Sequence, residues 1–213
     1  MVLTLESPSW RIKMNTPKYT SWYLNYKKGT EPWAYIDNVF DEAECEEIIN
    51  LNLSKHVEMI DATINNVNNV DNDYRRSRTG FILADDRSGW IFEKLADAIN
   101  FTNKKFFDFE LSQIDCLQLT EYDSANQGCY KKHIDMFHSG FTIRKLSFTV
   151  QLSDPASYTG GELLLHFSEC PDILKKQRGT VLFFPSWALH EVTPVTSGIR
   201  YSLVGWISGP KFK

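Results

Sequence analysis

The C-terminal half of the chain consists of short segments in which apolar and polar residues alternate. From residue 111 onward no helical period is seen, and turn residues separate the segments. Strands are predicted at 114–122, 130–137, 145–152, 162–167, 180–184, 190–194 and 200–207. Short strands at this spacing favour an all-β barrel or a double-sheet jelly roll.

The predicted strand at 146–152 has the clearest pattern. Its apolar residues alternate with its polar ones, with Leu146, Phe148, Val150 and Leu152 set against Ser147, Thr149 and Gln151. Because successive side chains of a strand leave on opposite faces, one face is apolar and the other polar. Two interpretations are open. The polar face meets solvent, or it lines a site inside the barrel while the apolar face packs under helices.

The N-terminal half predicts two helices. Asp41 is the expected N-cap of the first helix, and Glu44 completes a capping box. A buried stripe is expected to follow, formed by Cys45, Ile48, Ile49 and Leu53. The second helix, capped by Ser88 or Asp86, would bury one face, formed by Ile91, Leu95, Ala98 and Ile99.

The remaining N-terminal segments read as irregular or extended. Residues 1–32 are expected to form an irregular arm, 33–40 and 76–84 to contain strands, and the Asn-rich stretch 65–73 to form a loop. The prediction is therefore a single domain over 1–213. It has an N-terminal arm and a supporting α/β layer over 1–110, and a mainly β core over 111–208.

Composition narrows the choice of partners and compartment. The net charge of -4 gives no reason to expect nucleic acid as a partner. No apolar run approaches membrane-spanning length and no secretory signal is visible, so we expect no membrane partner and a cytoplasmic location. The 4 cysteines include no Cys-x-x-Cys pair, which favours free thiols in a reducing compartment.

The first candidate chemistry is a metal site. His133 and Asp135 lie two residues apart in a segment predicted to be extended, so both side chains would leave on one face. His190 is the candidate third ligand. Two histidines and one carboxylate suit non-haem Fe(II), with coordination positions left open. The His-x-Asp pair alone is weak evidence, because such pairs are common.

Arg200 adds a second chemical group. It follows His190 by ten residues on the next predicted strand, and Ser202, Val204 and Trp206 would share its face. A buried guanidinium needs an anion, and its planar fork suits a carboxylate. One interpretation pairs Arg200 with a protein carboxylate. The other gives it the far carboxylate of a dicarboxylate whose near end binds the metal.

Together these residues resemble a known family. Residues 112 to 208 resemble the Fe(II)/2-oxoglutarate-dependent dioxygenases, in the prolyl 4-hydroxylase-like branch. The resemblance is carried by Tyr122, Tyr130, His133-x-Asp135, Arg144, Gly160-Gly161-Glu162-Leu163, Gly179-Thr-Val-Leu-Phe-Phe-Pro185, His190-Glu-Val, Arg200 and Trp206. A weaker likeness extends upstream to the first predicted helix and to Arg76-Ser77. Arg76 is open to two interpretations, a functional residue at the rim of the site or a solvated one.

The resemblance implies a fold and a set of roles. The fold would be α+β but mainly β, with a double-stranded β-helix core (jelly-roll, cupin-like) supported by N-terminal helices. His133, Asp135 and His190 would bind Fe(II). Arg200 would bind 2-oxoglutarate, assisted by Tyr122, Ser202 and Gln151, the last of which stands where relatives often carry tyrosine. Tyr130, Arg144 and Trp206 would line the side that receives the substrate.

The implied reaction is hydroxylation with release of succinate and CO2. The cofactors would be Fe(II), 2-oxoglutarate and O2, with ascorbate left open as a further one. The leading hypothesis is hydroxylation of a prolyl residue in a peptide or protein. One alternative is a free amino acid or other small metabolite as substrate, and a second is a non-catalytic jelly-roll module that retains the metal site.

Overall fold

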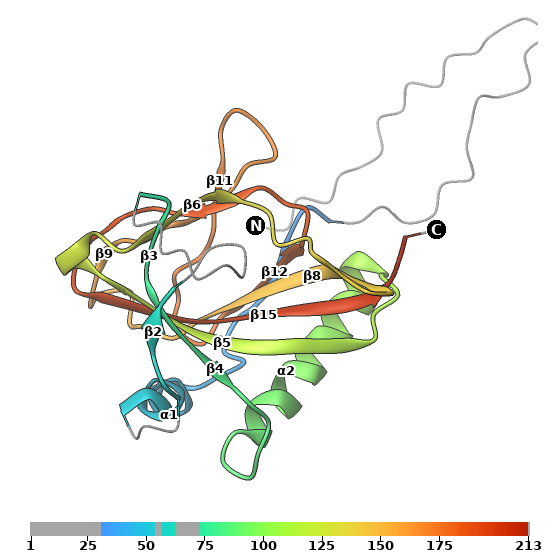
Figure 1. Ribbon diagram of the computed structural model, residues 1–213, viewed down its shortest axis with the longest axis horizontal. Helices are drawn as coiled ribbons and strands as arrows, with labels where there is room; N and C mark the ends of the chain where they lie inside the picture. The colour runs from blue at the N-terminus through green and yellow to red at the C-terminus, as the bar shows by residue number, and fades with distance from the viewer. Residues whose placement is uncertain (1–30, 54–56, 63–72, 213) are drawn as a thin grey trace, which may run out of the picture.

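The structure is a computed structural model that describes residues 31–53, 57–62 and 73–212 (Figure 1). The predicted arm over 1–32 and the predicted loop over 65–73 lie almost entirely outside these residues. Within the described ranges, no helix is both long enough and apolar enough to cross a bilayer. The division of the chain into one domain with two layers stays a prediction.

An eight-stranded sheet forms the centre of the fold. Its strand order is β1-β12-β8-β15-β5-β4-β2, with β7 beside β8, and neighbouring strands are antiparallel. The strands are β1 (Ala34–Ile36), β2 (Ile60–Asp61), β4 (Arg78–Ile82), β5 (Gln113–Asp123), β7 (His138–Ser139), β8 (Thr142–Gln151), β12 (Val181–Pro185) and β15 (Ile199–Pro210). The long strands β5 and β15 extend beyond the predicted strands at both ends, and β8 begins earlier than predicted and ends one residue before the predicted end.

A smaller sheet lies opposite. Its order is β11-β10-β13-β6-β3, and a separate pair joins β14 to β9. The strands are β3 (Arg75–Arg76), β6 (Cys129–His133), β9 (Thr159–Gly160), β10 (Leu163–Leu165), β11 (Asp172–Ile173), β13 (His190–Val192) and β14 (Val195–Ser197). The mainly β fold with two opposed sheets has the architecture of the predicted double-stranded β-helix.

The helices lie on one side of the large sheet, away from β6 and β11 (Figure 1). Helix α1 (Glu42–Leu53) begins with the predicted capping box, because the Asp41 and Glu44 backbone N–H groups donate to each other's carboxylates, both at 2.8 Å. Helix α2 (Gly89–Thr102) continues as the π-helical turn η1 (Asn103–Phe107). A short 3₁₀ turn, η2 (Ser124–Asn126), follows β5.

The N-cap of α2 is Ser88, one of the two predicted residues, but without the predicted side-chain cap. The carboxylate of Asp85 instead accepts from the backbone N–H groups of Arg87 at 2.9 Å and Ser88 at 3.0 Å. A carboxylate three residues before the N-cap can therefore order the helix entry in place of the residue at the cap itself.

Two apolar clusters cover the two faces of the large sheet. The first joins the helices to the sheet and includes Cys45, Ile48, Ile91, Leu95, Leu119, Phe148 and Leu203. The second lies on the other face of the sheet and includes Leu163, Leu165, Leu182, Phe184 and Val192. In α1, Cys45 and Ile48 are fully buried as predicted, while the side chain of Leu53 lies outside the described part.

Strand β8 decides between the two interpretations of its alternating pattern. Its apolar residues Leu146, Phe148, Val150 and Leu152 belong to the cluster under the helices. Its polar residues Ser147, Thr149 and Gln151 are buried as well, so they do not face solvent. The polar face is therefore an internal wall, and it needs polar partners inside the molecule.

Candidate metal and co-substrate site

A cavity of about 420 Å³ lies between the two sheets. The large sheet contributes Thr149, Arg200, Ser202, Val204 and Trp206, and the small sheet contributes His133, His190 and Val192. The alternation predicted for residues 200–206 is therefore what lines one wall of the cavity. The polar faces of the core strands meet around this space.

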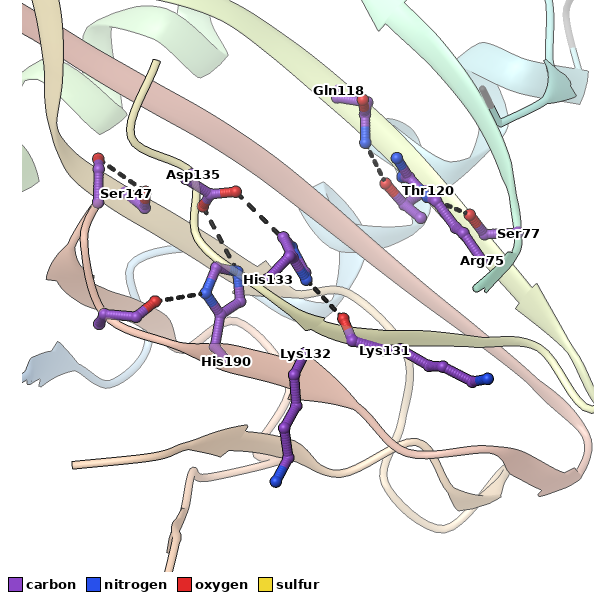
Figure 2. Close-up of polar contacts among 12 residues, drawn as sticks. Arg75, Ser77, Gln118, Thr120, Lys131, Lys132, His133, Asp135, Ser147 and His190 are labelled. Carbon is purple, nitrogen blue, oxygen red and sulfur yellow. Dashed lines mark hydrogen bonds and ion pairs between the residues drawn. The ribbon is translucent and has the colours of Figure 1, made fainter. Parts of the chain in front are cut away.

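Three side chains that line the cavity lie close to one another (Figure 2). His133 ends β6, His190 begins β13, and these two residues are opposite each other in the ladder. Nε2 of His133 is 3.7 Å from Oδ1 of Asp135, and Nε2 of His190 is 3.5 Å from Oδ2 of Asp135. The candidate ligand atoms of the three residues all lie within 4.8 Å of one another, which is close enough to hold one metal ion.

The structure corrects the reason given for this proximity. Strand β6 ends at His133, so Asp135 lies after the strand and not within it. The backbone N–H groups of Asp135 and Met136 both donate to the carbonyl oxygen of Ser186, at 2.9 and 2.8 Å. These bonds turn the chain after His133 and bring the carboxylate between the two histidines.

The hydrogen bonds of the histidines leave the inward nitrogens available. Nδ1 of His133 lies 2.8 Å from the carbonyl oxygen of Lys131, and Nδ1 of His190 lies 2.9 Å from that of Ala188. A carbonyl oxygen only accepts, so each Nδ1 carries the proton and each Nε2 keeps a lone pair. Backbone contacts of this kind orient metal-binding histidines.

The charge states also fit a cation. Burial and the neighbouring His190 lower the pKa of His133 to about 4, so its ring is neutral at pH 7. Burial would raise the pKa of the Asp135 carboxyl group, but the nearby His190 and His133 outweigh it and the net pKa is lowered. Asp135 Oδ2 is buried without a hydrogen-bond partner. A buried, unsatisfied carboxylate oxygen facing two imidazole lone pairs is the environment that a divalent metal would complete.

Arg200 lies deeper in the same cavity and is only 1% exposed. One terminal nitrogen donates to Oε1 of Gln151 at 3.1 Å and the other to the hydroxyl oxygen of Ser202 at 3.4 Å. Its Nε is buried without a partner. Among the described residues no carboxylate forms an ion pair with Arg200, so the interpretation that paired it with a protein acid finds no support there.

Tyr122 lies against the same guanidinium. The Cζ atom of Arg200 is 5.3 Å from the centre of the Tyr122 ring, and the two residues are opposite each other in the ladder of β15 and β5. Burial raises the pKa of the Tyr122 hydroxyl group, which stays protonated. The predicted set of Arg200, Tyr122, Gln151 and Ser202 is thus a contiguous polar pocket beside the three candidate metal ligands.

The Gly160-Gly161 turn leaves room for Arg200. Gly161 has φ +64°, a conformation that favours glycine, and a Cβ atom added there would lie 2.9 Å from Cδ of Arg200. Any larger residue would press on the arginine stem. The glycine pair noted in the sequence therefore bears directly on the pocket.

The three residues predicted for the substrate side also line the cavity, and Arg144, whose side chain is 24% exposed, lies nearer its mouth. The Tyr130 ring stacks on His133 with 3.6 Å between ring centroids, and burial raises the pKa of Tyr130 to about 12. Nε of Arg144 donates to Asp115 at 3.0 Å, and its Cζ lies 4.2 Å from the Trp206 ring. All three line the cavity, but Arg144 already has an acidic partner.

Sequence reasoning missed two residues of the site. One is Ser186, whose carbonyl oxygen positions Asp135 and whose hydroxyl lies 3.0 Å from that of Ser147. The other is Arg75, which lines the cavity and is 8% exposed, whereas Arg76 does not line it. An available signal was the Arg75-x-Ser77 spacing, which repeats the spacing of Arg200 and Ser202.

The fold and the site define a class of protein. A double-stranded β-helix that brings two histidines and one carboxylate together in a cavity is an arrangement suited to a single non-haem metal ion. Residues 117–208 match the family described as the 2OG-Fe(II) oxygenase superfamily. This part of the chain, which carries every candidate ligand, is similar to that superfamily.

Curated relatives match over the same half. A PKHD-type hydroxylase of Rippkaea orientalis is 37% identical over 98 residues, which cover 45% of this chain and 43% of the relative. A PKHD-type hydroxylase of Hyphomonas neptunium is 50% identical over 88 residues, which cover 39% of each chain. The matched region thus spans less than half the length of these relatives.

Solved structures share the fold over a greater length. A prolyl-4-hydroxylase of Pseudomonas putida superposes with a TM-score of 0.66 at 18% identity, covering 84% of this chain and 94% of the other. A prolyl hydroxylase of Trichoplax adhaerens, in complex with a fragment of hypoxia inducible factor, gives a TM-score of 0.68 at 18% identity and covers 83% of each chain. At this identity the likeness establishes the fold.

Proposed function

We propose that the protein is an Fe(II)- and 2-oxoglutarate-dependent dioxygenase that hydroxylates a C–H bond, with release of succinate and CO2. The observation that carries the proposal is the pairing of two incomplete sites in one cavity. His133, Asp135 and His190 offer three ligand atoms within 4.8 Å of one another, and Arg200 has a buried Nε without a partner and no paired carboxylate among the described residues. A metal chelated by a dicarboxylate completes both.

The metal and its co-substrate would supply the oxidising chemistry, and the chain supplies geometry and environment. His133, Asp135 and His190 would hold Fe(II) from one side and leave the other side open. Arg200 would fix the far carboxylate of 2-oxoglutarate, with Gln151 and Ser202 holding the guanidinium in place. The protonated Tyr122 would add a hydrogen-bond donor beside Arg200.

The tautomers of the histidines matter for this role. Both rings present Nε2 because their Nδ1 protons are committed to backbone carbonyls. The side chains of His133 and Asp135 are only 11% and 9% exposed, and a largely enclosed reaction site limits loss of reactive species to solvent. The backbone contacts would therefore orient both histidines before the metal or 2-oxoglutarate binds.

We further propose a prolyl residue of a peptide or protein as the substrate. The mouth of the cavity carries an apolar rim formed by Ile60, Phe81, Ile134 and Phe137, which are 51–55% exposed. An exposed apolar rim of this kind suits an extended partner better than a small polar metabolite. The prolyl hydroxylases among the structural neighbours support the same choice.

The test combines turnover with product identification. Purified protein is incubated with Fe(II), 2-oxoglutarate and ascorbate, with and without proline-containing peptides, and succinate and a 16 Da peptide mass increase, one added oxygen atom, are measured. A second set of reactions contains free L-proline and other amino acids. Succinate formation that rises with peptide and is matched by peptide oxidation supports the proposal, while oxidation of the free amino acid alone favours the metabolite alternative.

Variants connect the activity to the site. His133→Ala and Asp135→Ala should lower turnover by about 100-fold or more, since even outer partners of metal ligands contribute roughly 10- to 100-fold. His138→Ala is the matched control, because His138 is exposed and does not line the cavity. Full turnover in His133→Ala would overturn the proposed function. Metal binding by the wild type without any binding of 2-oxoglutarate would instead favour the non-catalytic module.

A further inference from the structure

A second buried arginine, Arg75, lies beside the candidate metal ligands. It is opposite Tyr130 in the ladder of β3 and β6, and its Cζ atom is 4.3 Å from the centre of the Tyr130 ring. That ring stacks in turn on His133. Figure 2 shows Arg75 and Ser77 on one side of the triad, next to Thr120 of β5. A positive charge is therefore held one ring away from a proposed metal ligand.

The hydrogen bonds of Arg75 leave one edge of its guanidinium available. Its Nε donates to the hydroxyl oxygen of Ser77 at 2.8 Å. Across residues 31–53, 57–62 and 73–212, the terminal nitrogens of Arg75 have no hydrogen-bond acceptor and no carboxylate pairs with it. The Tyr130 ring gives a cation–π contact, which attracts the charge but does not neutralise it. A largely buried cation without a nearby anion is costly, so the edge of Arg75 that borders the cavity favours an anionic ligand.

The carboxylates that line the cavity do not supply the missing anion. Asp135 lies between the two histidines, and Asp61 is exposed and forms no ion pair with Arg75. Arg144 provides the contrast within the same cavity, because it has Asp115 as its partner at 3.0 Å. Of the three arginines that line the cavity, Arg75 and Arg200 are thus the two whose charge the described chain leaves unpaired.

The two unpaired arginines have matching surroundings. Each has a serine two residues further on, whose hydroxyl oxygen accepts from its guanidinium, and each lies against a tyrosine ring. For Arg75 these are Ser77 and Tyr130, and for Arg200 they are Ser202 and Tyr122. The arrangement that would hold a carboxylate at Arg200 therefore occurs twice, on opposite sheets.

The charges of the proposed reactants indicate that Arg75 and Arg200 pair with different anions. This step rests on the proposed function. Asp135 and the near carboxylate of 2-oxoglutarate would balance a divalent metal, and the far carboxylate would balance Arg200. No charge of the co-substrate then remains for Arg75. We propose that Arg75 binds a carboxylate of the substrate that is hydroxylated, end-on through its two terminal nitrogens.

The experiment measures binding, not turnover. The protein is loaded with Mn(II) and N-oxalylglycine, an unreactive analogue of 2-oxoglutarate, so that the triad and Arg200 are occupied. Two pairs of probes are then titrated by calorimetry. N-acetyl-L-proline is compared with its amide, and acetyl-Pro-Glu-amide is compared with acetyl-Pro-Gln-amide. Each pair differs only in one carboxylate, carried by a free acid in the first pair and by a peptide side chain in the second.

We expect at least one carboxylate probe to bind about 10- to 100-fold more tightly than its amide, the range of a charge-assisted hydrogen bond. Arg75→Gln should remove this preference, and Arg75→Lys should keep part of it because it keeps the charge. Arg76→Gln is the matched control, since it removes the neighbouring charge from outside the cavity, and it should keep the full preference. Which pair shows the preference identifies a free acid or an acidic peptide as the source of the carboxylate.

Two results would overturn the inference while leaving the proposed function intact. One is equal binding of acid and amide in both pairs by wild-type protein that still binds Mn(II) and N-oxalylglycine. The other is an Arg75→Gln variant that weakens acid and amide equally, which would mean that Arg75 only supports the Tyr130 stack. Failure of the wild type to bind N-oxalylglycine would instead count against the proposed function itself.

Discussion

The two ends of the cavity are built in opposite ways. At the inner end, Arg200 and its partners are almost fully enclosed, and Gly161 leaves only enough space for the arginine stem. At the mouth, the apolar rim is about half exposed, and Arg144 is paired with a protein acid. An enclosed pocket with an unpaired charge suits one defined ligand. An exposed apolar rim can bind substrates of different shapes. The inner end therefore supports the proposed co-substrate class, while the mouth leaves the identity of the substrate open.

The largest expected effect is on the KM for 2-oxoglutarate, and it should distinguish the inner end of the cavity from the mouth. Arg200→Gln should raise the KM for 2-oxoglutarate about 100-fold, because loss of a buried charge partner costs roughly 2–5 kcal/mol and each 1.4 kcal/mol is about tenfold. Arg144→Gln, at the mouth, should leave that KM within about twofold and act on the substrate. The two KM values are measured by succinate formation. An unchanged KM for 2-oxoglutarate in Arg200→Gln would contradict the assignment of the inner end.

The second prediction concerns pH and the metal-free protein. The pKa of His133 is lowered from 6.5 to about 4 in the folded state. As pH falls through this window, the unfolded chain takes up a proton that the folded chain does not, so the free energy of unfolding decreases with falling pH. The loss between pH 6.5 and 4 should be at most about 3 kcal/mol, measured by urea denaturation. His133→Gln should flatten this dependence and His138→Gln, at the surface, should not. An identical slope in His133→Gln and wild type would contradict the buried, neutral histidine.

The inner end could be predicted from sequence to a large extent, and the reason is periodicity. Arg200, Ser202 and Trp206 were placed on one face by strand alternation, and the structure finds all three along the cavity wall. The same rule failed for Asp135, because its position depends on backbone bonds to Ser186, which lies on a distant segment. No local pattern encodes a contact of that kind.

Arg75 illustrates a second limit. Arg75 and Arg76 are adjacent and chemically identical, so composition and motif cannot choose between them. The register of β3 against β6 decides the matter, since it sets Arg75 opposite Tyr130 and Arg76 opposite Cys129. A shift of one residue would have reversed the two faces. Pairing register, which the sequence alone does not reveal, therefore determines which arginine enters the cavity.

A third prediction tests how tightly the inner end is closed. Gly161→Ala should raise the KM for 2-oxoglutarate about tenfold, because its Cβ would displace Arg200, and a full 1 Å misplacement costs roughly 100-fold. Gly140→Ala is the matched control. Gly140 also has a positive φ, +57°, but an added Cβ meets nothing within 4 Å. Both variants share the backbone strain, and only the first adds the clash. Equal KM values in the two variants would show that strain, and not contact with Arg200, is responsible.

The smallest expected effect belongs to the apolar rim. Phe81→Ala should raise the KM for a peptide substrate about fivefold and leave the KM for 2-oxoglutarate unchanged, because burying half of a phenylalanine side chain contributes about 1 kcal/mol. Phe141→Ala is the control, since Phe141 is 93% exposed but does not line the cavity. Both values come from peptide oxidation followed by mass spectrometry at varied peptide concentration. If the two variants behaved alike, the rim would have no part in substrate binding, and the mouth would recognise its substrate through polar groups alone.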